Sequence, residues 1–209
     1  MGAPLIDLRP AIRVRPAQRR DAPTLARLAN MAGEGLPRRL WKEMAKPGED
    51  PMAVGARRAA RSTGAFSWRN AHVATWHGAP VGASVDYDID AADPPGPDLP
   101  GWLHPLVALE ARAVGTRHVN MLAVVPQARR RGAANALLTD IAGRTGRDLS
   151  LIVASGNRVA RAFYAAWAFE ERARHPVGKA GSMGGDWILL TRAAMDRRPD
   201  VVGAPVRCG

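Results

Sequence analysis

The sequence contains almost no cysteine. Its 209 residues include a single one, Cys208, so the chain can form neither an intrachain disulfide nor a zinc site built from cysteines. One thiol agrees with a reducing compartment, and we expect the protein in the cytoplasm. Long apolar runs are also missing: no stretch is long enough to span a membrane, and Met1 to Pro10 lacks the apolar core of a secretory signal. These absences predict a protein without a membrane partner.

Lysine is scarce, because it occurs only at Lys42, Lys46 and Lys179, and arginine therefore carries nearly all of the positive charge. A formal net charge of +11 would suit a nucleic-acid binder. However, the arginines are scattered, and no dense basic tail or basic stripe with interleaved aromatics is present. The excess of alanine and arginine is what a GC-rich, bacterial-like coding bias produces. We therefore do not expect nucleic acid as a partner.

The length fits one domain with a full core. We divide the chain into a flexible lead-in at 1–10, one domain at 11–193 and a tail at 194–209. Inside the domain, an insert at about 88–101 is rich in Asp, Pro and Gly. Together with the helix expected at 102–113, this insert is a candidate either for a lid over an acceptor site or for a surface excursion.

The most informative stretch runs from Val119 to Leu138. Its first half is apolar and predicts a buried strand that ends at Pro126, because proline cannot donate to a sheet ladder. A basic turn follows, and from Ala133 the apolar residues recur at helical spacing, with Gly143 as the expected end of the helix. The stretch therefore predicts a strand, a basic glycine-containing turn and a helix.

This arrangement suits an anion. The first amides of a helix have no partner within it and carry partial positive charge, so a phosphate can accept several of them. Small residues at 132–134 let a ligand approach the backbone, and arginines at 129–131 supply charges and donor forks suited to phosphate. An ordinary strand-to-helix connection with solvated arginines is the alternative. The known ATPase loop and the glycine-rich dinucleotide loop are both absent.

Two motifs in this region resemble a known family. Arg129-x-x-Gly132-x-Ala134 is similar to the acetyl-coenzyme A signature Gln/Arg-x-x-Gly-x-Gly/Ala of the GNAT N-acetyltransferase superfamily. The segment 157–169 is similar to that family's Asn-x-x-Ala-x-x-Phe-Tyr-x-x-x-Gly-Phe, and it follows at the expected distance. Arg130 and Ala168 depart from the pattern, since many members have glycine at both positions. The resemblance covers 11–193.

The resemblance implies an α/β fold that agrees with the pattern of the chain. We expect a single-domain GNAT fold: a mixed, mostly antiparallel sheet of about six to seven strands, splayed at the cofactor site, with helices on both faces. A glycine-rich hairpin loop is expected at 177–185. The expected strands lie at 12–15, 71–76, 81–87, 119–125, 149–154, 169–176 and 186–192, and the expected helices at about 23–32, 38–45, 52–62, 102–113, 133–142 and 158–167.

The resemblance also implies an acyltransferase that uses acetyl-coenzyme A as co-substrate. It would move the acetyl group to a primary amine by direct attack, the acceptor being a small molecule or a peptide. The splayed strand would offer backbone amides to the thioester, and Tyr164 would protonate the leaving thiolate. The cofactor-binding residues implied are Leu122, Ala123, Val124, Arg129, Arg130, Arg131, Gly132, Ala133, Ala134, Asn157, Ala160, Phe163 and Tyr164. No metal site is expected.

The general base is left open by the sequence. In straight alternation His118 and Asn120 share a face of the central strand with Leu122, and of the two polar residues only the histidine can take a proton near neutral pH. As a base, His118 would titrate near the ordinary histidine pKa of about 6 to 7. Glu34, flanked by glycines in the expected acceptor region, is the competitor. A water relay is a third route, and a strand-end histidine exposed to water is the structural alternative for His118.

A second class of function stays open at this point. The changed residues Arg130 and Ala168 and the unassigned base also fit a non-catalytic GNAT-like protein that binds coenzyme A or RNA. The oligomeric state is open too, and a homodimer is one of the options.

Overall fold

A computed structural model describes residues 12–92, 96, 99–177 and 185–194. They form one mixed sheet of seven strands in the order β1-β2-β3-β4-β5-β7-β6. All neighbouring strands are antiparallel except β4 and β5, which are parallel. The strands are β1 (Arg13–Pro16), β2 (Ala71–Trp76), β3 (Ala79–Asp88), β4 (Arg117–Val124), β5 (Leu149–Ala154), β6 (Glu170–Val177) and β7 (Gly185–Arg192).

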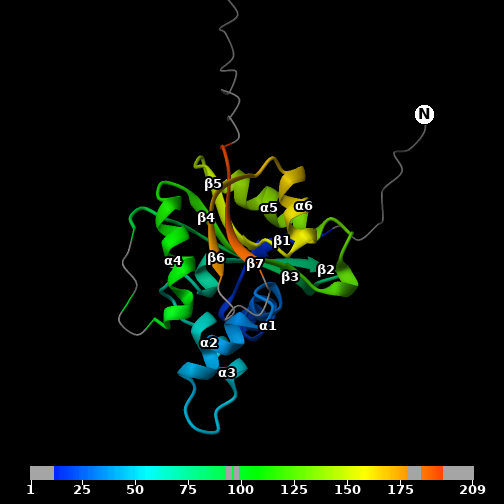
Figure 1. The fold of residues 1–209 in the computed structure, drawn as a ribbon. Coiled ribbons are helices and arrows are strands. Elements are labelled where there is room, and N and C mark those ends of the chain that lie inside the picture. The colour runs from blue at the N-terminus through cyan, green and yellow to red at the C-terminus, as the bar shows by residue number, and fades with distance from the viewer. Residues whose placement is uncertain (1–11, 93–95, 97–98, 178–184, 195–209) are drawn as a thin grey trace, which may run out of the picture.

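Helices cover both faces of this sheet (Figure 1). One face carries the first four helices, and the opposite face carries the last two. The helices are α1 (Ala22–Ala32), α2 (Leu36–Met44), α3 (Pro51–Ala59), α4 (His104–Glu110), α5 (Ala133–Arg144) and α6 (Arg158–Ala166). The expected fold class is therefore confirmed, and β2 and β5 have the expected bounds.

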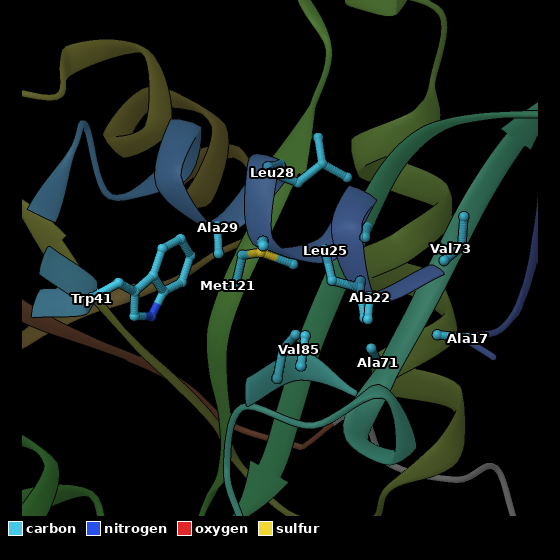
Figure 2. Close-up of a cluster of buried hydrophobic side chains, with 14 of the residues drawn as sticks. Ala17, Ala22, Leu25, Leu28, Ala29, Trp41, Ala71, Val73, Val85 and Met121 are labelled. Carbon is cyan, nitrogen blue, oxygen red and sulfur yellow. The ribbon is translucent and has the colours of Figure 1, made fainter. Parts of the chain in front are cut away.

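The core between the sheet and α1 is built from small and aliphatic side chains. Leu25 of α1 gathers with Val85 of β3 and Met121 of β4, and Trp41 of α2 lies beside them (Figure 2). Gly55 of α3 faces the Trp41 ring so closely that an added Cβ would lie 2.5 Å from it. Burial of such apolar surface is the main stabilising term, worth roughly 25 cal/mol per Å². This layer fixes α1 and α2 over the sheet.

Strands β4 and β5 are paired over two residues only. Arg117 is the partner of Leu149, and His118 is the partner of Ser150. Beyond this pair, β4 continues beside β3, while β5 continues beside β7. The expected splay between the two parallel strands is therefore confirmed, and its vertex is the His118–Ser150 pair.

A β-bulge in β4 changes which residues share a face. Asp86 of β3 is opposite Val119 and Val85 is opposite Met121, so Asn120 is the extra residue. Val119 and Leu122 both pack on the face covered by α5 and α6, although three positions separate them. The expectation that His118 shares a face with Leu122 is wrong, because one extra residue inverts the alternation beyond it.

A buried carboxylate lies next to the bulge. Asp86 is fully buried and accepts a hydrogen bond from Arg117 Nε at 2.7 Å and from an Arg144 guanidinium nitrogen of α5 at 3.0 Å. Replacing a buried ion pair by apolar groups is often neutral or stabilising, so this cluster is weak proof of stability. These hydrogen bonds fix the C-terminal end of α5 to the sheet.

Some expectations need correction. Gly143 lies inside α5, which continues to Arg144, because a glycine in helical conformation costs only about 1 kcal/mol relative to alanine. The helix after the insert is part of the core, since Leu109 of α4 is buried against β7.

Other expectations cannot be compared with the structure. The lead-in at 1–10, most of the loop at 177–185, the insert residues 93–95 and 97–98, and the tail beyond residue 194 with Cys208 lie outside the described residues. No helix among the described residues has the length and apolar character that a membrane crossing requires.

Candidate active site at the split between β4 and β5

The N-terminus of α5 opens directly after the split strand. Gly132 takes the N-cap position with φ of 86°, a conformation that L side chains rarely adopt, and no atom of the described residues lies within 4 Å of where its Cβ would stand. No side chain of the described residues caps this helix, and its first internal hydrogen bond runs from the Ala136 amide to the Gly132 carbonyl. The amides at 133–135 therefore have no partner within the helix and face the turn.

The three arginines of the turn are all exposed. Arg129 Nε donates to the Val124 carbonyl at 3.4 Å, and the Arg131 guanidinium lies 4.3 Å from the centre of the Trp76 ring. Trp76 of β2 was not expected at this site; a tryptophan at the end of a hairpin strand gives no sequence signal for such a contact. Arg130 has φ of 59°, where glycine would be less strained. The three arginines thus directly precede the N-terminus of α5 in the chain, and two of them contact the ends of β4 and β2.

Asn157 and Glu34 meet at the far side of the split. Asn157 caps α6, since its side-chain oxygen accepts from the Ala160 amide at 3.0 Å. Its side-chain nitrogen donates to Glu34 Oε1 at 3.4 Å, although 123 positions separate the two residues. Glu34 is exposed in the turn between α1 and α2. Its carboxylate therefore lies next to the C-terminal end of β5.

Tyr164 packs on the α5 and α6 face of the sheet. Its side chain is 8% exposed and lies edge-on to Phe163 and Phe169, with ring centres 5.2 and 5.4 Å away. Val119 and Leu122 of β4 border the same cluster. Within the described part of the chain the Tyr164 hydroxyl makes no hydrogen bond. Burial raises the pKa of this hydroxyl above its ordinary value, so it keeps its proton at neutral pH.

His118 lies on the opposite face and is buried, with 1% of its surface exposed. Its Nδ1 is 2.9 Å from Ser150 Oγ, and its Nε2 is 4.0 Å from Glu110 Oε1. Burial lowers the pKa of His118 to about 4. Two expectations are therefore wrong: the histidine is not an exposed strand end, and its pKa is not near 6 to 7. The sequence could not show the burial because α4, which covers it, follows a loop of irregular composition.

Sequence reasoning missed three groups around His118. Glu110 of α4 has its pKa raised by burial, and Tyr87 of β3 has its pKa raised by burial and by the charge of Glu110. The Tyr87 ring lies 5.7 Å from the His118 ring, and its hydroxyl accepts a hydrogen bond from Asn120 at 3.4 Å. Ser150 is the third group. The one available signal was that Glu110 is the only acidic residue in the helical stretch 102–113.

The arrangement was compared with known proteins. No family model and no curated protein sequence matches the chain. Solved structures do match. An N-acetyltransferase from Staphylococcus aureus has a TM-score of 0.60 at 14% identity, over 86% of this chain and 100% of the other. A protein from Desulfovibrio desulfuricans assigned to the GNAT acetyltransferases has a TM-score of 0.52 at 18% identity, over 88% and 100%. The protein has the GNAT fold.

A third structure with the same fold shows a ligand. Naa50 from Arabidopsis thaliana, in complex with the bisubstrate analogue CoA-Ac-MVNAL, has a TM-score of 0.51 at 16% identity. The alignment covers 88% of this chain and 99% of that one. At such identities the likeness establishes the GNAT fold of this chain and nothing about its ligands.

Ala168 stands where the GNAT motif has glycine, and the structure shows why glycine fits there. The Phe169 amide donates back to the Tyr164 carbonyl and the Ala168 amide to the Ala165 carbonyl, which is a Schellman ending of α6. This ending requires positive φ at Ala168, and its φ is 59°. Alanine pays about 1 kcal/mol or more for this left-handed conformation. The same strain is present at Arg130, the other departure from the motif.

The first prediction concerns this strain. Ala168→Gly should raise the free energy of unfolding by roughly 1 kcal/mol, because the relief of left-handed strain exceeds the extra entropy of glycine in the unfolded chain. Ala166→Gly, two positions earlier in helical conformation, should lower it by roughly 0.5–1 kcal/mol. Urea unfolding of the two variants checks this. Equal signs for the two changes would contradict the conformation assigned to Ala168.

The second prediction concerns the buried imidazole. A lowered pKa in the folded state means that the unfolded chain binds a proton that the folded chain does not, between about pH 4 and pH 6.5. Over that interval the free energy of unfolding should fall as the pH falls. His118→Gln should remove roughly 3 kcal/mol of this fall. Identical pH dependence in the wild type and His118→Gln would show that His118 is not held neutral.

Proposed function

We propose that the protein is an N-acetyltransferase that moves the acetyl group of acetyl-coenzyme A to a primary amine by direct attack in a ternary complex. The observation that carries this is the split between β4 and β5, followed by the uncapped N-terminus of α5. A slot between two parallel strands suits an extended pantetheine arm, and the helix N-terminus suits a pyrophosphate. The acetyltransferase structures with the same fold support the proposal.

In this proposal the pyrophosphate accepts hydrogen bonds from the amides at 133–135, and the arginines at 129–131 add charge around it. The backbone at 122–124 lines the slot, because β5 leaves β4 before this point. Its amides are fixed by the sheet, so they polarise a thioester carbonyl without reorganising. In this proposal Asn157, Ala160 and Phe163, at the start of α6 and along it, contact the cofactor from the other side of the slot.

In the proposed chemical step, the base and the acid act from opposite faces of the sheet. The nitrogen lone pair of a neutral amine attacks the thioester carbonyl carbon, and a base takes the amine proton. The tetrahedral intermediate collapses with cleavage of the carbon–sulfur bond, and the thiolate takes a proton from Tyr164. A hydroxyl with a raised pKa is protonated at rest, so its proton is available to the sulfur as the carbon–sulfur bond breaks.

His118 is the proposed base, because it is uncharged at neutral pH and borders the vertex of the split. Glu34 stays the alternative, since its contact with Asn157 places a carboxylate at the other end of β5. The exposed carboxylate of Glu34, beside Asn157, would offer hydrogen-bond acceptors to an amine. Primary amines of small molecules and of peptides therefore remain the acceptor class, and the Naa50 complex with a peptide-containing analogue is one example of the second kind.

The third prediction tests cofactor binding. Calorimetry should show coenzyme A binding to the wild type, and Gly132→Glu should weaken it at least about tenfold, or 1.4 kcal/mol, because a carboxylate would stand at the anion site. Gly48→Glu is the matched control: it also has positive φ and open space around it, in the loop between α2 and α3. No binding at millimolar coenzyme A, or equal binding by Gly132→Glu, would refute the proposal. Binding without any transfer would favour the non-catalytic alternative.

The fourth prediction tests the acid. With acetyl-coenzyme A and a panel of amines that includes polyamines and peptides with free N-termini, thiol release should report turnover. Tyr164→Phe should lower kcat by roughly 100-fold, with little change in KM for acetyl-coenzyme A, because only the proton donor is lost. Its thermal stability should stay near that of the wild type, since the hydroxyl has no hydrogen-bond partner among the described residues. Turnover at the wild-type rate would remove Tyr164 from the mechanism.

A further inference from the structure

A continuous line of buried hydrogen bonds runs behind His118. His118 Nδ1 lies 2.9 Å from Ser150 Oγ, which lies 2.7 Å from Thr116 Oγ1. Thr116 Oγ1 in turn lies 2.7 Å from the carbonyl oxygen of Ala113, in the turn that follows α4. Ser150 is fully buried and Thr116 is 9% exposed. The line therefore joins β4, β5 and the end of the α4 segment.

The last member of the line fixes the direction of every bond. A carbonyl oxygen can only accept, so the Thr116 hydroxyl must donate its single proton to Ala113. Thr116 Oγ1 is then an acceptor for the Ser150 hydroxyl, whose single proton is thereby used. Ser150 Oγ has no proton left for His118. His118 Nδ1 must therefore be the donor in the first bond.

The other side of the imidazole agrees with this direction. Once Nδ1 carries the proton of the neutral ring, Nε2 holds a lone pair. A protonated Nε2 would be expected to donate to the nearest carboxylate, but Glu110 Oε1 is 4.0 Å away, beyond hydrogen-bond distance. Tyr87 of β3 and Glu110 of α4 are the titratable groups that face the ring among the described residues.

We propose that Ser150 and Thr116 are positioning residues that hold His118 in the Nδ1–H tautomer, with Nε2 as the proton acceptor beside the vertex of the split. This inference rests on the proposed acetyl transfer for its catalytic meaning. The nitrogen that carries the proton is set by the bond that the other nitrogen makes, and the wrong tautomer disables a histidine base even where the geometry is intact. Because the line ends on a backbone carbonyl, no titration of a carboxylate can reverse the direction of its hydrogen bonds.

The test exchanges one hydroxyl while keeping the shape of its side chain. Thr116→Val removes the donor to Ala113 and the acceptor for Ser150, so the Ser150 hydroxyl becomes free to donate to His118 Nδ1. Thr116→Ser is the matched control, because it keeps the hydroxyl. Nuclear magnetic resonance of isotope-labelled histidine distinguishes the two tautomers by the signals of the imidazole nitrogens. The His118 signals are assigned by their loss in His118→Gln.

Near neutral pH we expect the Nδ1–H pattern in the wild type and in Thr116→Ser, and the Nε2–H pattern in Thr116→Val. Ser150→Ala provides a second variant should Thr116→Val fail to fold: His118 Nδ1 then loses its partner, and the Nδ1–H form should lose its dominance. An Nε2–H pattern in the wild type would overturn the inference. So would an unchanged pattern in the variant that folds.

Kinetics separate this inference from the proposed function. With an acceptor in hand, kcat/KM should fall at least about tenfold in Thr116→Val and stay within about twofold in Thr116→Ser, with coenzyme A affinity unchanged in both. A tautomer change without loss of activity would show that the hydrogen bonds from His118 through Ser150 and Thr116 have no role in catalysis. If the wild type transfers no acetyl group but shows the expected spectra, the proposed function fails and the assignment of the tautomer stands.

Discussion

The sheet divides at the contact between His118 and Ser150, because β4 and β5 are not paired beyond it. It is the last pair between β4 and β5, and each strand afterwards follows a different partner. Beyond this pair β4 keeps its hydrogen bonds to β3, while no described strand pairs with its other edge. Such an edge inside a domain must be satisfied by a ligand or by water, since unpaired backbone groups are costly to bury. The same residue pair is therefore both the last contact between the two strands and the point where they separate.

The bulge at Asn120 decides what each side of that site contains. Without it, His118 and Leu122 would point the same way, and the imidazole would lie among the apolar side chains beside Tyr164. One extra residue turns His118 toward α4, where Glu110, Tyr87 and Ser150 form a polar surrounding. The sequence carries no signal for this bulge, because Asn120 lies in an otherwise regular apolar strand with no glycine or proline. That is why the alternation predicted the wrong face.

Local features were predictable, and distant contacts were not. Pro126 ended the strand, and Gly132 and Asn157 marked the starts of two helices, because proline, glycine and a capping amide act within a few residues. The order of the elements followed from such signals together with the two motifs. Ser150 and Glu34, by contrast, meet their partners 32 and 123 positions away. The burial that lowers the pKa of His118 likewise comes from elements outside its own strand. These distant contacts and this burial depend on tertiary packing, which no short sequence pattern contains.

Burial moves the pKa values of the two proposed catalytic groups in opposite directions, and both shifts favour the neutral form. It raises the pKa of Tyr164 and lowers that of His118, because in each case the low-dielectric interior disfavours the charged form. At neutral pH the tyrosine therefore keeps its proton and the histidine lacks one, although the same shifts make the tyrosine a weaker acid and the histidine a weaker base. Charge appears only when an amine attacks and a thiolate leaves. A site whose proton donor and acceptor are both neutral at rest avoids the cost of burying an unpaired charge before the substrates arrive.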